Sequence, residues 1–151
     1  MNDIDYAKIS MNVAEESFKK GSFPAGAVII QDDKIISKQI SGKYPNYHLH
    51  AESKAIDESI EKLGEQLTNC TLYASMEPCL MCLSRAYWGG IRRIVYIIKK
   101  ENVDSKICYE SNLNQKNLLT QFNEKIEMIH LSELEPKALD IYKKWLSTNK
   151  M

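Results

Sequence analysis

Residues 70–98 read CTLYASMEPCLMCLSRAYWGGIRRIVYII, and this stretch decides the fold class. Residues 70–74 and 92–98 are largely apolar and contain β-branched and aromatic side chains, a pattern that predicts two strands. A helix is expected between them over residues 79–88, with Pro78 in its first turn. Strands that alternate with helices are typical of a layered α/β domain.

The N-terminal segments extend this pattern. A first helix is expected to have Asp3 as its N-cap and to end near Gly21. Its apolar residues recur at helical spacing, and they are Ile4, Ala7, Met11, Ala14 and Phe18. Residues 26–31 and 34–41 then read as the two strands of a hairpin, joined by a turn at Asp32-Asp33.

Helical periodicity returns over residues 50–63, after a loop rich in turn-forming residues. Residues 99–123 show no clear pattern, and residues 126–131 predict a last strand. The tail over residues 132–148 predicts an amphipathic helix, and Ser132-x-x-Glu135 resembles a capping box at its start.

We therefore expect a three-layer α/β/α domain with a mixed five-stranded sheet, whose first hairpin is antiparallel. No internal repeat or Pro/Gly/Ser-rich linker divides the chain, so residues 1–151 are expected to form one domain. The helix expected over residues 132–148 is a candidate for closing the active site, either its own or a neighbour's.

The charge balance narrows the function classes. The chain has 20 basic and 20 acidic residues, and this neutral total argues against a general nucleic-acid binder. Apolar runs such as residues 27–30 and 94–98 contain at most five residues and are far too short to cross a bilayer. Residues 1–5 contain no basic region followed by an apolar run, so no secretory signal is visible. A soluble cytoplasmic protein is the expectation.

Two short segments carry the chemistry: His50-Ala51-Glu52 and the Cys79-x-x-Cys82 pair. Each lies where a predicted helix begins, and cysteines three apart on a helix project to the same side. The positive end of the helix dipole there favours the thiolate form that a metal needs. One imidazole and two thiolates suit a catalytic zinc ion, which keeps a fourth position for water. Glu52 is then placed to move protons rather than to bind the ion.

Two other interpretations of the cysteines remain open. Cys-x-x-Cys can be a redox pair, although no other redox feature accompanies it. A structural four-ligand zinc site would need one further donor. The candidates for that donor are Cys70, Cys108, His48 and His130.

The motifs resemble the cytidine and deoxycytidylate deaminase superfamily, in its nucleobase and nucleoside deaminase branch. Residues 77–82, EPCLMC, are similar to a box shared by bacterial guanine deaminases and tRNA-specific adenosine deaminases. Residues 24–28, PAGAV, look like the start of that family's first strand. Ala86-Tyr87-Trp88 looks most like the guanine deaminase group, and the resemblance covers about the first hundred residues.

The resemblance implies hydrolytic deamination with one zinc ion per chain, bound by His50, Cys79 and Cys82. Zinc-bound hydroxide attacks the carbon that bears the amine, and Glu52 carries the proton to the ring and to the leaving ammonia. The backbone amide of Ala51 would face the developing oxygen. The backbone carbonyl of Glu77 would accept a hydrogen bond from the leaving amine. The side chains of Phe23 and Trp88 would form walls of the substrate pocket, and simple core packing is an equal alternative for these two aromatic residues.

The pattern also departs from this family at the substrate side. Gln39 stands where an Asn is usual, and residues 46–49, NYHL, replace the family's Asp-Pro-Thr-Ala. His48 is therefore a candidate pocket residue, although a surface role is the alternative. Glu110 is a candidate contact to a ring NH or amino group, and the alternative is a solvated carboxylate.

Several functions follow from these features. The leading hypothesis is deamination of a free, guanine-like purine. Alternatives within the same chemistry are cytosine or another aminated heterocycle or nucleoside, and tRNA adenosine. An alternative of another class is a non-catalytic interaction module stabilised by zinc, against which the presence of Glu52 argues. The family usually forms dimers through the face that bears the zinc helices, so the resemblance implies a homodimer.

Overall fold

The computed structural model describes residues 1–110 and 112–149. Five strands form one sheet in the order β2-β1-β3-β4-β5. Strand β1 pairs antiparallel with both β2 and β3, whereas β3, β4 and β5 run parallel. The strands are β1 (Gly26–Gln31), β2 (Lys34–Ile40), β3 (Thr71–Met76), β4 (Arg93–Ile98) and β5 (Glu127–His130). The expected mixed five-stranded sheet with an antiparallel first hairpin is confirmed.

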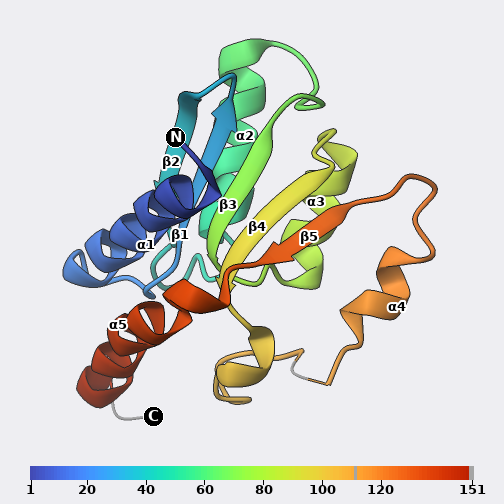
Figure 1. The fold of residues 1–151 in the computed structure, drawn as a ribbon. Helices are drawn as coiled ribbons and strands as arrows, with labels where there is room; N and C mark the ends of the chain where they lie inside the picture. The colour runs from blue at the N-terminus through green and yellow to red at the C-terminus, as the bar shows by residue number, and fades with distance from the viewer. Residues whose placement is uncertain (111, 150–151) are drawn as a thin grey trace.

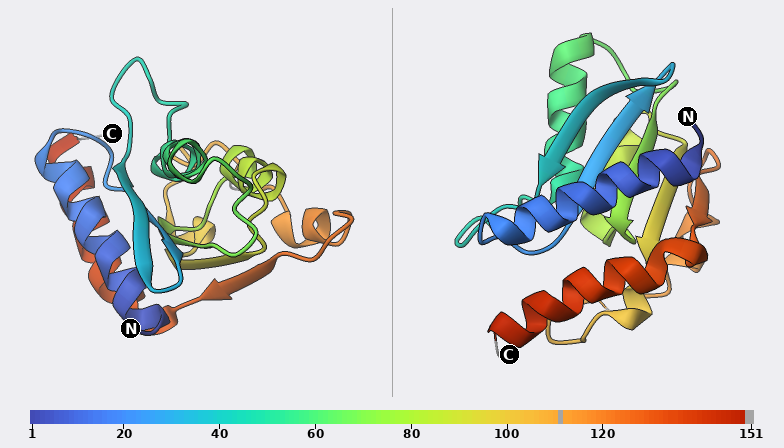
Figure 2. Two further views of the ribbon diagram at one scale, coloured as in Figure 1. Left: turned by 90° about the horizontal axis from the view of Figure 1, so that it is seen from above. Right: turned by 60° about the vertical axis from the view of Figure 1, so that its left-hand side comes forward.

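Two pairs of helices cover the two faces of the sheet (Figures 1 and 2). One layer contains α1 (Asp3–Lys19) and α5 (Glu135–Asn149), and the other contains α2 (Ala51–Leu63) and α3 (Leu80–Trp88). This arrangement confirms the three-layer α/β/α architecture. The shorter elements are η1 (Lys100–Asn102), α4 (Gln115–Leu119) and η2 (Ser132–Leu134).

The central strands bury both of their faces. In β1, Val28 and Ile30 pack in the core beneath α1 and α5, while Ala27 and Ile29 pack toward α2 and α3. A strand that is covered on both sides reads as a continuous apolar run rather than an alternating one. This is why the sequence of β1 shows no polar positions before Gln31.

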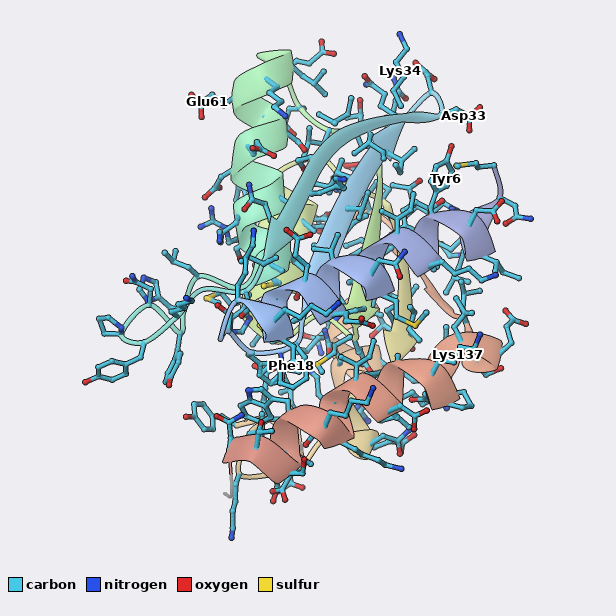
Figure 3. All side chains as sticks on the ribbon, turned by 90° about the vertical axis from the view of Figure 1, so that its left-hand side faces the viewer. Tyr6, Phe18, Asp33, Lys34, Glu61 and Lys137 are labelled. Atoms are coloured by element: carbon cyan, nitrogen blue, oxygen red, sulfur yellow. The ribbon has the colours of Figure 1, made fainter. Side chains whose placement is uncertain are left out.

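The β1–β2 hairpin is fixed at its turn and by the first helix. Asp32 and Asp33 adopt positive φ values of 50° and 61°, as a tight two-residue hairpin turn requires. The hydroxyl of Tyr6 in α1 donates a hydrogen bond of 2.7 Å to Asp33, and Figure 3 shows the two residues close together. This hydrogen bond connects the N-terminal half of α1 to the hairpin turn at the edge of the sheet.

The starts of α1 and α3 differ from expectation. The N-cap of α1 is Asn2 rather than Asp3, since the Asn2 side chain accepts from the amide of Asp5 in a reciprocal capping box. Helix α3 begins at Leu80 with Cys79 as N-cap, so Pro78 lies before the helix and not in its first turn. This placement leaves both the amide and the side chain of Cys79 outside the regular helix.

The capping box expected at residues 132–135 does not form. Ser132 to Leu134 make a 3₁₀ turn, and α5 begins only at Glu135. The Glu135 carboxylate instead accepts a 2.8 Å hydrogen bond from the backbone amide of Lys99. Strand β3 is also longer than expected, because pairing with β4 continues to Met76. Within the described residues, no helix combines the length and apolar character that a membrane crossing requires.

Candidate metal and active site

The starts of α2 and α3 bring the three predicted zinc ligands together. His50 is the N-cap of α2, Cys79 is the N-cap of α3, and Cys82 lies in the first turn of α3. Neither N-cap side chain forms a capping hydrogen bond with its own helix. Both side chains are therefore available to meet between the two helices.

The donor atoms have the spacing that zinc requires. His50 Nδ1 lies 3.4 Å from Cys79 Sγ and 3.5 Å from Cys82 Sγ. A tetrahedral ion with Zn–S near 2.3 Å and Zn–N near 2.0 Å places such nitrogen and sulfur atoms about 3.5 Å apart. All three donors lie within 4.8 Å of one another, so the group fits one tetrahedral zinc ion with a fourth position left over.

The donors also favour metal binding electrostatically. A hydrogen bond from Cys82, together with a smaller contribution from His50, lowers the pKa of the Cys79 thiol to about 4, although burial opposes the shift. The same contact between the sulfurs, together with burial, raises the pKa of Cys82. The lowered pKa favours the thiolate form of Cys79, and a bound cation would stabilise a second thiolate at Cys82.

Glu52 lies beside the donors but points into the protein interior. Its side chain belongs to the first turn of α2, and the residue is only 5% exposed. Burial raises the pKa of this carboxyl to about 7, and the nearby His50 opposes part of that shift. A carboxyl group with a pKa near neutrality can both accept and release a proton. The geometry therefore suits a proton carrier rather than a fourth ligand.

The backbone positions predicted for the substrate lie at the same helix starts. Ala51 is the first residue of α2 and is fully buried, and the first amides of a helix have no partner within it. The side chain of Glu77 is occupied, because its Oε1 accepts a 3.0 Å hydrogen bond from the backbone amide of Lys100. Any contact of Glu77 with a substrate would therefore involve its backbone carbonyl.

The two aromatic residues expected as pocket walls lie in different surroundings. The Phe23 ring packs against Trp145 of α5, with ring centroids 4.9 Å apart. Trp88 is 79% exposed at the last position of α3. A helix rises 1.5 Å per residue, so Trp88 is about 13 Å from Cys79 along the axis. The structure does not bring Trp88 to the ligands.

The polar residues expected to contact the substrate also lie in different surroundings. Gln39 pairs with Ala27 across the hairpin, and directly opposed residues share a face of the sheet. Because Ala27 packs toward α2 and α3, Gln39 lies on the side of the sheet that carries the ligands. His48 is exposed in the loop before α2. Glu110 accepts a 2.8 Å hydrogen bond from the amide of Leu80, so its carboxylate contacts the start of α3.

Sequence reasoning missed two residues that contact this region, Lys100 and Gln115. Both are buried, and both lie in the stretch that shows no hydrophobic periodicity. Gln115 donates a 2.9 Å hydrogen bond to the carbonyl of Pro78, and Lys100 pairs with Glu110 at 2.8 Å. No local pattern marks such residues, because their role depends on contacts distant in the sequence.

The sequence matches a known protein family and several of its members. Residues 1–98 match the family model described as the cytidine and deoxycytidylate deaminase zinc-binding region, and this range contains all three donors and Glu52. The chain is 28% identical to a probable cytosine deaminase of Schizosaccharomyces pombe over 134 residues, covering 84% of this chain and 82% of that one. It is 36% identical to the guanine deaminase of Bacillus subtilis over 100 residues, covering 64% of each chain. It is 32% identical to a tRNA-specific adenosine deaminase of Buchnera aphidicola over 117 residues, covering 74% and 72%.

Solved structures share the fold. The guanine deaminase of Bacillus subtilis superposes with a TM-score of 0.62 at 26% identity, covering 95% of both chains. A guanine deaminase from Nitrosomonas europaea superposes with a TM-score of 0.78 at 18% identity, covering 93% of this chain and 82% of that one. A structure from a study of tRNA:A34 deaminases reaches 0.71 at 23% identity, covering 89% and 96%. At these lower identities the likeness concerns the fold alone.

Proposed function

The chain belongs to the cytidine and deoxycytidylate deaminase family, and we propose that it hydrolytically deaminates a free nucleobase, with a guanine-like purine favoured. The observation that carries this proposal is the joint placement of three zinc donors and the buried Glu52 at the starts of α2 and α3. A site that only stabilised the fold would not need a buried carboxyl group with a pKa near neutrality beside the donors.

The zinc donors, Glu52 and Ala51 would each have a different role in the deamination. Zinc held by His50, Cys79 and Cys82 would lower the pKa of a water molecule and so supply a nucleophile at neutral pH. Glu52 would accept one proton from the attacking water and transfer it to a ring nitrogen, and it would then move the proton of the new hydroxyl group to the departing amine. The amide of Ala51 donates to the oxygen that forms on the ring carbon. Water and the aminated base are thereby converted into the oxo base and ammonia.

The favoured substrate follows from the relatives and from the charge distribution. The guanine deaminase of Bacillus subtilis is similar both in sequence and over the whole fold. The basic residues at the start of β4 are already paired: Arg92 with Glu124 at 3.2 Å, and Arg93 with Asp3 and Glu127. These pairs leave less positive charge for RNA phosphates, which supports a small substrate over tRNA.

Cytosine is the second candidate. The probable cytosine deaminase of Schizosaccharomyces pombe matches 84% of this chain, a larger share than the 64% matched by the guanine deaminase. Gln39 lies on the ligand side of the sheet, where base deaminases of this branch usually carry Asn, and this difference supports a changed contact to the ring.

The test is ammonia release by zinc-loaded protein with guanine, adenine, cytosine, their nucleosides, other aminated heterocycles and a tRNA anticodon stem-loop. Guanine is expected to be the best substrate, and Glu52→Ala protein is the control. Release from cytosine alone would transfer the assignment to the second candidate. If zinc-loaded protein releases no ammonia from any of these substrates, the result would contradict deamination and favour the non-catalytic zinc module.

We propose further that the chain forms a homodimer through the outer surface of α3. Leu80, Met81 and Trp88 all project from this helix and are 37%, 38% and 79% exposed. Exposed apolar and aromatic side chains grouped on one element are typical of a protein interface. A cytoplasmic location stays a prediction from the sequence.

A further inference from the structure

The loop that carries Cys79 is held by the end of β4, where the Glu77 amide donates a 2.8 Å hydrogen bond to Ile98, and by the segment that follows β4. Glu77 accepts a hydrogen bond of 3.0 Å from the amide of Lys100. The Pro78 carbonyl accepts one of 2.9 Å from Gln115, and the Leu80 amide donates one of 2.8 Å to Glu110. Every neighbour of Cys79 from residue 77 to residue 80 is therefore tied to residues 100–115. In Figure 1 this segment leaves the end of β4 and returns through α4.

Lys100 joins the three contacts into one network. Its ammonium lies 2.8 Å from Glu110 and within hydrogen-bond distance of the Gln115 side-chain oxygen. The residue is only 8% exposed, although lysine is rarely buried. A buried charge is tolerated only when it is paired and hydrogen-bonded, so the network must form as a unit.

We propose that Lys100, Glu110 and Gln115 form a bracket that positions Cys79 for zinc. Cys79 is an N-cap whose side chain makes no capping hydrogen bond, so the contribution of α3 itself to its orientation is the interaction with Cys82. The bracket fixes the peptide groups on both sides of Cys79 and thereby limits where its sulfur can lie. Removing a group that hydrogen-bonds to the ligand-bearing residues, without itself binding the metal, commonly lowers metal affinity about 10- to 100-fold.

The network also balances the negative charge of Glu110 near the Cys79 and Cys82 sulfurs. The Glu110 carboxylate lies at the positive end of the α3 dipole, which stabilises an anion there. The same negative charge would oppose a thiolate at Cys79, and the Lys100 ammonium compensates for it. Glu110 and Lys100 are thus expected to act as a pair, and loss of Lys100 should weaken zinc binding more than loss of both charges.

Zinc release from the intact protein tests the bracket. Gln115→Leu removes both hydrogen bonds of Gln115 at nearly constant volume, and Lys100→Met keeps the aliphatic stem without the charge. Gln121→Leu and Lys106→Met change exposed residues of the same region and serve as matched controls. With excess chelator, both bracket variants should release zinc about 10-fold faster than the wild type, and both controls should match the wild type.

A second readout separates positioning from simple stability. Cobalt in place of zinc reports thiolate geometry through its visible absorption, which should change in the bracket variants and not in the controls. Unchanged zinc release and cobalt spectra, with equal losses of Tm in the metal-free and zinc-bound proteins, would overturn the proposal. If Lys100→Met does not fold, Glu110→Gln and the Lys100→Met/Glu110→Gln double variant decide by the same readouts. Because these measurements need no substrate, their result is independent of which base the protein deaminates.

Discussion

Gln39 is the side chain whose identity bears most directly on the substrate. It lies on the ligand-bearing side of β2, whereas the neighbouring Lys38 points away and is exposed. An amide at this position can donate and accept, as the recognition of a planar aminated ring requires.

Gln39→Ala is expected to raise KM about 5-fold and to change kcat less, because a hydrogen bond to bound substrate contributes about 1 kcal/mol. Steady-state kinetics on the preferred base, with Lys38→Ala as the control, measure the effect. An unchanged KM in Gln39→Ala would show that Gln39 does not contact the ring.

The metal ligands could be predicted from the sequence because their spacing is local. His50 and Glu52 are two residues apart, and Cys79 and Cys82 share one helical turn, so helix geometry alone places each pair. The surroundings of Trp88 could not be predicted in this way. Its place in the motif says nothing about the direction of α3, which carries it away from the zinc donors to an exposed position.

At the scale of single elements, the strands and long helices were predictable to within about two residues. Their apolar residues follow a period of two or of 3.6, or are continuous where both faces are buried. Residues 99–123 have no such period because contacts distant in sequence determine their structure. Lys100 pairs with Glu110 and Glu135 binds the amide of Lys99, and neither contact leaves a local signature.

Helix α5 contacts the segment before β1 through an aromatic residue. Trp145 packs on Phe23, and Phe23 immediately precedes the turn into β1. We propose that α5 closes the site of its own chain through this contact.

Trp145→Ala is expected to lower the free energy of unfolding by about 1–2 kcal/mol, since the side chain is only partly buried. If α5 closes the site, the same variant also raises KM, with zinc content unchanged. Thermal melts and kinetics beside the exposed Lys144→Ala control measure both effects. A lower Tm with an unchanged KM would show that α5 is only structural.

An ion pair ties the start of α1 to the sheet. Arg93 of β4 contacts Asp3 at 2.5 Å and 2.9 Å, and the hydroxyl of Tyr73 donates to the same carboxylate at 2.6 Å. The Arg93 guanidinium holds the pKa of Asp3 below its ordinary value of 3.8. The stabilisation is therefore fully present above that ordinary pKa and disappears as the pH falls through the lowered one.

Asp3→Asn is expected to cost about 1 kcal/mol at pH 7, a modest value because the pair is about one-third exposed. The difference from the wild type should shrink below pH 3. Denaturant unfolding at both pH values measures it, with Asp140→Asn at an exposed position of α5 as the control for loss of one negative charge. A cost that did not change with pH would contradict an ionic contribution.

At the scale of the whole molecule, the sheet separates two tasks. The layer of α1 and α5 buries aromatic and aliphatic side chains, whereas the layer of α2 and α3 holds the zinc donors at the helix starts. The outer surface of α3 would then bring two sites close together in a dimer.

Trp88→Glu is expected to convert a dimer into a monomer, because it places a charge in the centre of the proposed apolar contact. Light scattering coupled to gel filtration gives the mass directly. The control is Glu61→Ala on the exposed side of α2, which should leave the mass unchanged. A wild-type protein that is monomeric at micromolar concentration would exclude this interface.

The central claim is that one zinc ion held by His50, Cys79 and Cys82 works together with Glu52. Its most direct test is turnover per bound zinc, measured for wild-type and Glu52→Gln proteins on the preferred base. Gln has nearly the shape of Glu but cannot carry the proton, so Glu52→Gln should bind one zinc per chain and lose at least about 100-fold in kcat. A Glu52→Gln protein that binds zinc and turns over as fast as the wild type would contradict the account.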